Sequence, residues 1–232
     1  MSFFRNFSFN VVCSTLVFAV GLLNQGLLAG HLGRSDYGVF TLWTQTSLIV
    51  ALVLGEWLRR GTTYVVGREQ KVREARDNVI IYVCILVPTA LLISWLFRFK
   101  LVSVLGTPID QYWYLIALAA SAVVLQRCGQ AVLLGLDRVR AYAIVPLVFI
   151  CSYGLMNVIL WRYDSLNIFS VLSVFISAAL IASIITFAFL QGSSGGFRGG
   201  DRKLIFDVYS VGRRGAISVL LVFLLLKSDL FL

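Results

Sequence analysis

Charged residues are scarce in this sequence. Asp, Glu, Lys and Arg together make up 13% of its 232 residues, whereas 59% are hydrophobic. This balance excludes a soluble domain. The hydrophobic residues form long unbroken runs instead of the short alternating segments of a transmembrane barrel, so each run is expected to satisfy its own backbone hydrogen bonds as a helix. The composition therefore predicts an all-α polytopic membrane protein.

Residues that carry out much enzymatic chemistry are also scarce. His31 is the single histidine, and its place favours a solvated loop residue over a proton relay. The four cysteines lie within hydrophobic runs and lack the spacing of metal ligands. The sequence has no Gly-rich loop of the Walker type, so no ATP site is expected. We expect no nucleophile, no metal and no other cofactor, and a protein that is not an enzyme.

Basic residues outnumber acidic ones, with 20 Lys and Arg against 11 Asp and Glu, and they are unevenly distributed. If the chain has seven spans, most of the Lys and Arg residues lie on the same side of the membrane as the N-terminus. The opposite side has few, namely Arg34, Arg98, Lys100 and Arg162. The positive-inside rule then places the N-terminus in the cytoplasm. Nucleic acid is not an expected partner, because the basic loops are short and lack an aromatic stacking platform.

We expect the chain to have three parts. Residues 1–190 form a lobe of six spans, residues 191–214 form a cytoplasmic linker rich in Gly and Ser, and residues 215–232 form a seventh span. The six spans are predicted at Phe7–Leu28, Val39–Leu54, Val79–Phe97, Tyr112–Leu134, Tyr142–Trp161 and Ile168–Leu190. An external turn, residues 28–40, joins the first two. Because charges lie close before the apolar end of the chain, we interpret it as the N-terminal portion of a longer protein.

Three charged residues interrupt the hydrophobic segment of the second span. Glu56, Arg59 and Arg60 follow the apolar run, and residues 62–66 are apolar again. Ionisable groups at such depth cost about 2.5–3.5 kcal/mol each and usually face a bundle interior or a wet cavity. Glu56 has two open interpretations. It neutralises Arg59 or Arg60 at helical spacing, or it takes part in ion coupling.

Polar side chains also occur within the first and fourth spans. Asn24 and Gln25 lie near the end of the first span, where they predict either helix packing or the lining of a cavity. In the fourth span, Gln126 and Gln130 share one face, and Arg127 lies about two turns before the inner end. Arg127 either extends to the membrane interface or contacts an anion inside the bundle.

Four features of the chain carry a family resemblance. The junction LAGHLGRSDYGVF (residues 28–40) is followed by LVLGEWLRRGTTYVVGRE (residues 52–69). A short inner turn precedes the fifth span, and GRRGAISVLLVFLLLKSDLFL (residues 212–232) ends the chain. In this order they resemble polysaccharide flippases of the Wzx type, within the multidrug/oligosaccharidyl-lipid/polysaccharide exporter superfamily. The resemblance implies a six-helix transmembrane lobe plus the start of a seventh span, which is one half of a MATE-like fold.

The resemblance also implies a function. Such a protein flips a polyprenyl-diphosphate-linked oligosaccharide across the bacterial inner membrane by alternating access, for the synthesis of O-antigen, capsule or exopolysaccharide. The expected partners are this lipid-linked oligosaccharide, the membrane, a second half-transporter and polysaccharide polymerase or assembly proteins. Arginine suits a diphosphate because its planar fork donates bidentate hydrogen bonds.

Ten residues are candidates for this function. The candidates for substrate binding are Arg59, Arg60, Arg127, Lys227, Asn24, Gln25, Gln126 and Gln130. Glu56 and Asp229 are the candidates for coupling to protons or sodium ions. Two other functions stay open. A multidrug exporter of the same superfamily needs acids in its cavity, and here bases outnumber acids. An inactive half, or an assembly partner without transport, fits a missing second lobe.

Overall fold

The structure is a computed structural model that describes residues 2–69, 71–96, 98–99, 112–194 and 199–227. Over these ranges it contains helices and no strand. The helices are α1 (Ser2–Glu69), α2 (Val72–Leu96), α4 (Trp113–Gly135), α5 (Val139–Arg162), α6 (Ile168–Ser194) and α7 (Arg202–Lys227). Five of them, α1, α2, α4, α5 and α6, are long and apolar enough to cross a membrane. The chain is therefore an all-α, multi-pass membrane protein, which confirms the predicted fold class.

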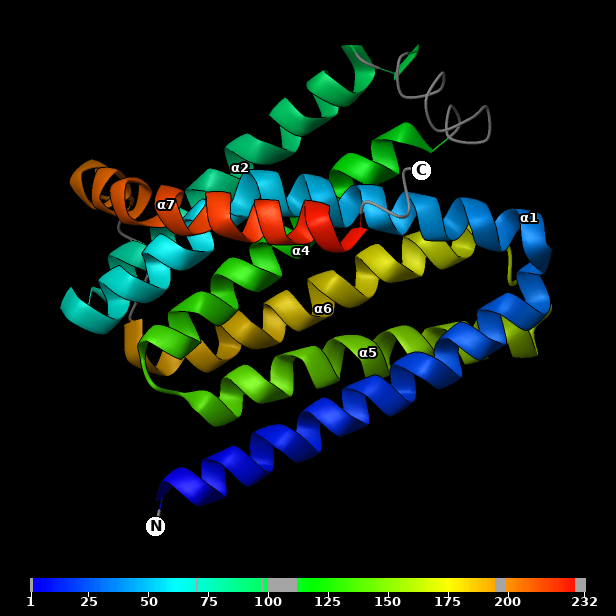
Figure 1. The fold of residues 1–232 in the computed structure, drawn as a ribbon, viewed down its shortest axis with the longest axis horizontal. Coiled ribbons are helices and arrows are strands. Elements are labelled where there is room, and N and C mark those ends of the chain that lie inside the picture. Colours follow the sequence, from blue (N-terminus) through cyan, green and yellow to red (C-terminus); the bar gives the residue numbers. More distant parts are fainter. Residues whose placement is uncertain (1, 70, 97, 100–111, 195–198, 228–232) are drawn as a thin grey trace.

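Helix α1 contains two of the predicted spans. Its 68 residues are helical except at Gly33, where φ is 73° and ψ is 169°. Figure 1 shows the helix folding back sharply between its two arms, so α1 crosses twice and the five helices provide six crossings. The external turn was predicted over residues 28–40, but all of these except Gly33 are helical. A single glycine is enough to fold the helix back on itself, because glycine adopts this combination of φ and ψ and hardly any other residue does.

We expect Gly33→Ala to destabilise the protein by about 1–3 kcal/mol, because alanine is strained at this positive φ. No atom lies within 4 Å of the place where its Cβ would be, so the effect comes from the backbone alone. Gly30 is the matched control, because it is helical, three residues away and equally uncrowded. Gly30→Ala is expected to leave stability unchanged or to raise it slightly. Thermal unfolding in detergent distinguishes the two variants, and an equal midpoint for both would contradict this explanation.

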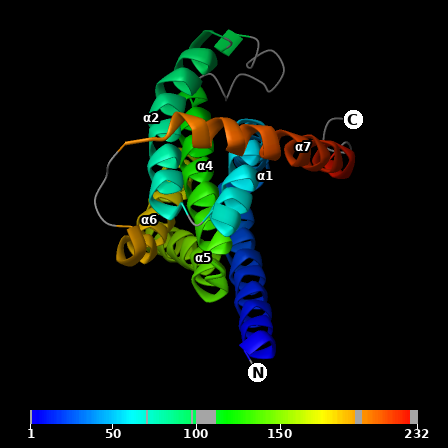
Figure 2. The ribbon, with the colours of Figure 1, turned by 90° about the vertical axis from the view of Figure 1, so that its left-hand side faces the viewer.

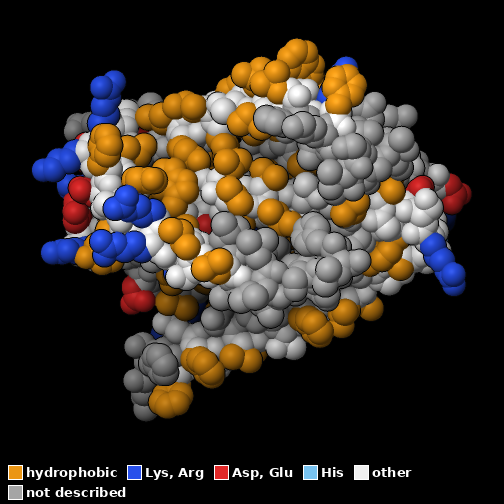
Figure 3. Space-filling model, turned by 45° about the horizontal axis from the view of Figure 1, so that its top comes forward, with side chains coloured by type: hydrophobic (Ala, Val, Ile, Leu, Met, Phe, Trp, Pro, Cys, Tyr) orange, Lys and Arg blue, Asp and Glu red, His pale blue; other side chains and the backbone are white. Residues whose placement is uncertain are grey.

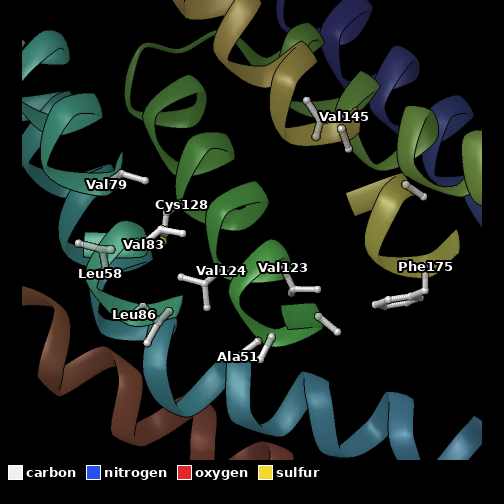
Figure 4. Close-up of a cluster of buried hydrophobic side chains, with 14 of the residues drawn as sticks. Ala51, Leu58, Val79, Val83, Leu86, Val123, Val124, Cys128, Val145 and Phe175 are labelled. Carbon is white, nitrogen blue, oxygen red and sulfur yellow. The ribbon is translucent and has the colours of Figure 1, made fainter. Parts of the chain in front are cut away.

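Helix α4 lies at the centre of the bundle. In its most apolar stretch 83% of the residues are buried, against 17–39% in the other candidate spans. Figure 4 shows Val124 and Cys128 on the side of α1 and α2, where they pack near Leu58 and Val83. On its other side, Val123 lies toward Phe175 of α6. Residues on α4 therefore face protein rather than lipid, which is the environment that polar side chains in a membrane span require.

Helix α7 begins earlier than predicted. Residues 202–214 were assigned to a linker, but they form the first half of α7. The Asp201 carboxylate caps this helix by accepting a hydrogen bond from the backbone N–H of Lys203 at 2.9 Å. Leu204 and Val208, one turn apart, are buried. The sequence analysis overlooked this short amphipathic pattern because it follows a stretch rich in Gly and Ser. The apolar side of the pattern packs onto another helix.

That other helix is the second arm of α1, which α7 crosses at a steep angle (Figure 2). At the crossing each helix places a glycine against the backbone of the other. A methyl group on Gly61 would lie 2.0 Å from the carbonyl oxygen of Val208, and one on Gly212 would lie 1.9 Å from that of Trp57. Each glycine thus touches the carbonyl four residues before the other glycine. Small residues allow such close helix contacts in membranes, and Cα–H···O contacts add to them.

Candidate functional site

The three charged residues of the second arm of α1 form one ion-pair cluster. Arg59 binds the Glu56 carboxylate in a bidentate manner, with Nε 2.8 Å from Oε2 and Nη2 2.6 Å from Oε1. Arg60 donates from Nε to Oε1 of the same carboxylate at 2.8 Å. Glu56 is 3% exposed, and its two partners reach it from i+3 and i+4. The structure therefore contains the pairing that the sequence left open, whereas a role of Glu56 in ion coupling stays a prediction.

Close packing of α1 on α4 brings a further cation to this cluster. A methyl group on Gly55 would lie 2.8 Å from Val124, so the two helices nearly touch there. One turn further along α4, the Cys128 thiol donates to the Gly55 carbonyl at 3.8 Å. Arg127, the neighbour of Cys128, interacts electrostatically with Glu56 and Arg59. Arg59 and Arg60 thus share one carboxylate, so the cluster keeps an excess of positive charge. Arg127 lies close enough to feel the charges of this cluster but forms no ion pair with Glu56.

Arg127 opens onto a cavity of about 350 Å³ inside the lobe. The cavity lies between both arms of α1, α4, α5 and α6, and its lining residues are Val17, Leu48, Val123, Gln126, Arg127, Gln130, Pro146, Phe149, Ile150 and Phe175. The structure therefore brings together three of the predicted residues, Gln126, Arg127 and Gln130, on one wall. The other walls are apolar, so the polar groups of α4 determine what the cavity binds.

These polar groups present hydrogen-bond donors without partners. Arg127 is half-buried, and among the described residues it has neither a hydrogen bond nor an ion pair within 4.0 Å. The Gln130 Nε2 atom is buried and also lacks a partner. A guanidinium group donates five N–H groups and accepts none. The cavity wall is therefore complementary to an anionic or acceptor-rich ligand and unfavourable for a cation.

Asn24 lies in a different buried cluster. It accepts a hydrogen bond at 3.0 Å from Nδ2 of Asn157 on α5, and the hydroxyl of Tyr153 lies beside both amides. Asn24 is not among the residues that line the cavity of Arg127. The sequence analysis missed Asn157, although an Asn within an apolar span is a signal for a contact between helices. The Asn24 side chain thus contacts a neighbouring helix, as the helix-packing interpretation requires.

Gln25 is not among the residues that line this cavity, and the side chains of two further candidates lie outside the described part of the chain. Gln25 is exposed and accepts a hydrogen bond from the Tyr37 hydroxyl at 2.8 Å, across the fold at Gly33. Lys227 is the last residue of α7, but its side chain lies outside the described part of the chain. Asp229 lies outside it altogether. Within the described ranges, no group of three or more metal-binding side chains occurs.

The fold is similar to that of three solved transporters. A MOP superfamily transporter from Pyrococcus furiosus, described as having a binding pocket of reverse polarity that suggests a different function, superposes with a TM-score of 0.66 at 14% identity. A MATE in complex with Br-NRF gives a TM-score of 0.66 at 13% identity. An outward-facing multidrug resistance MATE family transporter of the MOP superfamily gives a TM-score of 0.63 at 13% identity.

These similarities extend over most of this chain and about half of each transporter. The matches cover 92%, 93% and 92% of this chain, but 52%, 55% and 52% of the solved chains, respectively. No protein-family model matches the sequence, and no curated protein matches it. The chain thus has a MATE-like fold and spans about half the length of each of these structural neighbours.

Proposed function

We propose that the chain is one lobe of a flippase that moves a polyprenyl-diphosphate-linked oligosaccharide across the bacterial inner membrane. The observation that carries this proposal is Arg127, a guanidinium group without a partner on the wall of a cavity inside the lobe. An unpaired charge in a membrane span is costly and is usually retained for a function. A ligand that supplies anionic oxygen atoms removes this cost.

The diphosphate group of the proposed substrate matches this wall. Phosphate oxygens accept the two parallel N–H groups of a guanidinium fork, an arrangement stronger than neutral hydrogen bonds. Gln126 and Gln130 flank Arg127 on α4, where their amides can bind sugar hydroxyls. Arg59 and Arg60 carry two positive charges and share the single negative charge of Glu56. The remaining positive charge is available for a second phosphate. The polar groups on α4 replace part of the hydration that a polar head group loses in hydrocarbon.

The complete transporter is proposed to contain a second lobe, which follows in the same chain or is a separate half-transporter. The N-terminus is proposed to be cytoplasmic, because the basic residues gather on its side of the membrane. Polysaccharide polymerase and assembly proteins are the proposed partners. Glu56 and Asp229 stay the candidates for ion coupling.

Multidrug export is the second candidate function, since two of the structural neighbours are MATE transporters, one of them described as a multidrug resistance protein. An exporter of cationic drugs needs acidic groups, and the residues that line the cavity of Arg127 include no Asp or Glu. The Pyrococcus neighbour is described as differing in pocket polarity and, by suggestion, in function. Pocket charge is therefore a reasonable criterion, and here it favours the anionic substrate.

We expect Arg127→Ala, in the complete transporter in its host, to lower surface polysaccharide export by about 10- to 100-fold, because charge-assisted hydrogen bonds contribute about 1.5–3 kcal/mol. Arg127→Lys keeps the charge but loses the fork, so export should fall less. Arg140→Ala is the matched control, because Arg140 contacts Asn6 at the exposed end of the bundle and not the cavity. Immunoblots of the membrane fraction confirm equal protein levels.

Two outcomes decide against the proposal. Normal export by Arg127→Ala would contradict the role of the cavity in polysaccharide transport. Changed drug susceptibility with normal export would favour multidrug transport instead. Reconstitution of the purified chain in liposomes, alone and with a second half-transporter, then tests the remaining alternative of an inactive half. Transport in neither preparation would support that alternative.

A further inference from the structure

The first half of α7 has an exposed face that mixes basic and aromatic side chains. Phe206 is 71% exposed and Tyr209 is 48% exposed. Four exposed basic residues flank them at the two ends of this half-helix, namely Arg202, Lys203, Arg213 and Arg214. We call these six residues the α7 stripe. Asp207 is the one acidic residue within this half-helix, and it is half-buried.

Packing fixes the direction in which the α7 stripe faces. Leu204 and Val208 are buried on the opposite side of the helix, and Gly212 touches the backbone of α1. The helix cannot rotate to bury Phe206 without exposing these residues and separating the two glycine contacts. The Phe206 ring is therefore held outward by the α1–α7 crossing, whereas the half-exposed Tyr209 ring also packs against Trp57 of α1.

The same face becomes purely apolar further along the helix. Ile217 is 61% exposed and Leu221 is 57% exposed, as expected for side chains that face lipid tails. Arg213 and Arg214 lie one turn before Ile217, and the Arg213 guanidinium lies over the Tyr209 ring at 5.8 Å. Along α7 the exposed face thus changes from cationic and aromatic to aliphatic, which is the order of environments from headgroup region to hydrocarbon.

The surroundings of the α7 stripe are basic as well. Figure 3 shows Lys and Arg side chains gathered at the end of the molecule where α7 begins, with hydrophobic side chains among them. Two of the acids nearby are already engaged, since Asp201 caps α7 and Glu69 pairs with Lys71 at 2.8 Å. A purely solvated face accounts for the basic residues but not for Phe206 and Tyr209, whose exposure to water is unfavourable.

We propose that the α7 stripe binds the headgroups of anionic phospholipids. Its four basic residues contact lipid phosphates, while Phe206 and Tyr209 insert among the headgroups, the position that aromatic side chains prefer at a membrane surface. Charge complementarity selects this partner, because the cytoplasmic leaflet carries anionic lipids that attract basic segments next to a span. The binding serves to hold the start of α7 at the membrane surface and does not depend on which substrate the protein transports.

The test is the thermal unfolding of the purified chain in neutral detergent with added phosphatidylglycerol or phosphatidylcholine. Phosphatidylglycerol is expected to raise the unfolding midpoint in a concentration-dependent manner, because a ligand of the folded state stabilises it. Phosphatidylcholine is expected to have little effect, and salt should weaken the effect of phosphatidylglycerol. Arg213→Gln/Arg214→Gln should lower the apparent affinity for phosphatidylglycerol roughly tenfold or more.

The matched control is Arg34→Gln/Arg162→Gln, which removes two exposed arginines at the opposite end of the bundle. It should keep the response of the unaltered chain. Native mass spectrometry provides a second readout if a variant unfolds too early for a clear midpoint, because it counts the phosphatidylglycerol molecules retained. An equal response to both lipids, or a full response by Arg213→Gln/Arg214→Gln, would overturn the proposal and leave a protein partner, such as a second lobe, as the occupant of the α7 stripe.

Discussion

Replacing Gly212 by alanine is expected to separate α7 from α1. The added Cβ would lie 1.9 Å from the Trp57 carbonyl oxygen, and that oxygen belongs to a helix backbone that cannot move aside as a side chain can. Overpacking typically costs about 1–3 kcal/mol. We expect a loss of about 3 kcal/mol in the free energy of unfolding, because two helix backbones must move apart.

A cross-link measures this separation directly. Cysteines at positions 57 and 209, which replace two aromatic side chains whose rings lie 5.5 Å apart, should be joined efficiently by a short bifunctional thiol reagent on an otherwise native backbone and poorly after Gly212→Ala. Gly61→Ala should have the same effect, since it blocks the same crossing from the other side. The double variant should be little worse than either single variant. Gly38→Ala on α1, where no atom lies within 4 Å of the new Cβ, is the control.

An unchanged cross-linking yield after Gly212→Ala would show that α7 tolerates a larger distance from α1. The α7 stripe would then lose the rigid support from which its direction was argued. A reduced yield with an unchanged unfolding midpoint would instead show that the crossing positions α7 without contributing to the stability of the bundle. The two measurements therefore separate the geometric role of the glycines from their energetic role.

Glu56→Ala is expected to be clearly destabilising. It removes the carboxylate that accepts three charge-assisted hydrogen bonds from Arg59 and Arg60. The loss of one partner from a buried pair costs about 3–5 kcal/mol. The Arg59 and Arg60 side chains are 29% and 40% exposed, so water can solvate them once the carboxylate is gone. We therefore expect the free energy of unfolding to fall by about 2–3 kcal/mol.

Glu69→Ala is the matched control for this change. Glu69 lies on the same helix and also pairs with a cation, Lys71, but both side chains are exposed, at 34% and 44% respectively. Its removal should change stability little. Chemical denaturation in detergent provides the comparison. Equal midpoints for Glu56→Ala and Glu69→Ala would show that the three-residue cluster is as solvated as a surface pair.

Several elements of this molecule follow directly from its sequence. The hydrophobic runs predicted the six crossings of the lobe, and the turn predicted at residues 28–40 contains Gly33, where the chain folds back between the first two. The i+3 and i+4 spacing predicted that Glu56 can reach Arg59 and Arg60. These features depend on residues close together in the chain, so they can be predicted from the sequence alone.

Other features depend on contacts between distant segments. The hydrogen bond between Asn24 and Asn157 joins residues 133 positions apart, and nothing near Asn24 indicates that partner. The position of Arg127 on a cavity wall depends on how α1, α4, α5 and α6 are arranged, so the sequence alone could not place it there. The start of α7 was missed because the apolar side of its first half consists only of Leu204, Val208 and Gly212, and this pattern becomes clear only with α1 packed against it.

The central position of α4 has a consequence for biosynthesis. With a mean hydropathy of 1.5 over its best window, it is the least apolar of the five candidate spans, whose other values lie between 1.9 and 2.6. As the chain leaves the ribosome, α1 and α2 reach the translocon before α4 does, and α5 and α6 follow. We therefore expect Arg127 and its flanking glutamines to leave the translocon beside α1 and α2, the helices against which α4 packs, so that these helices shield them from lipid before α5 and α6 enclose them.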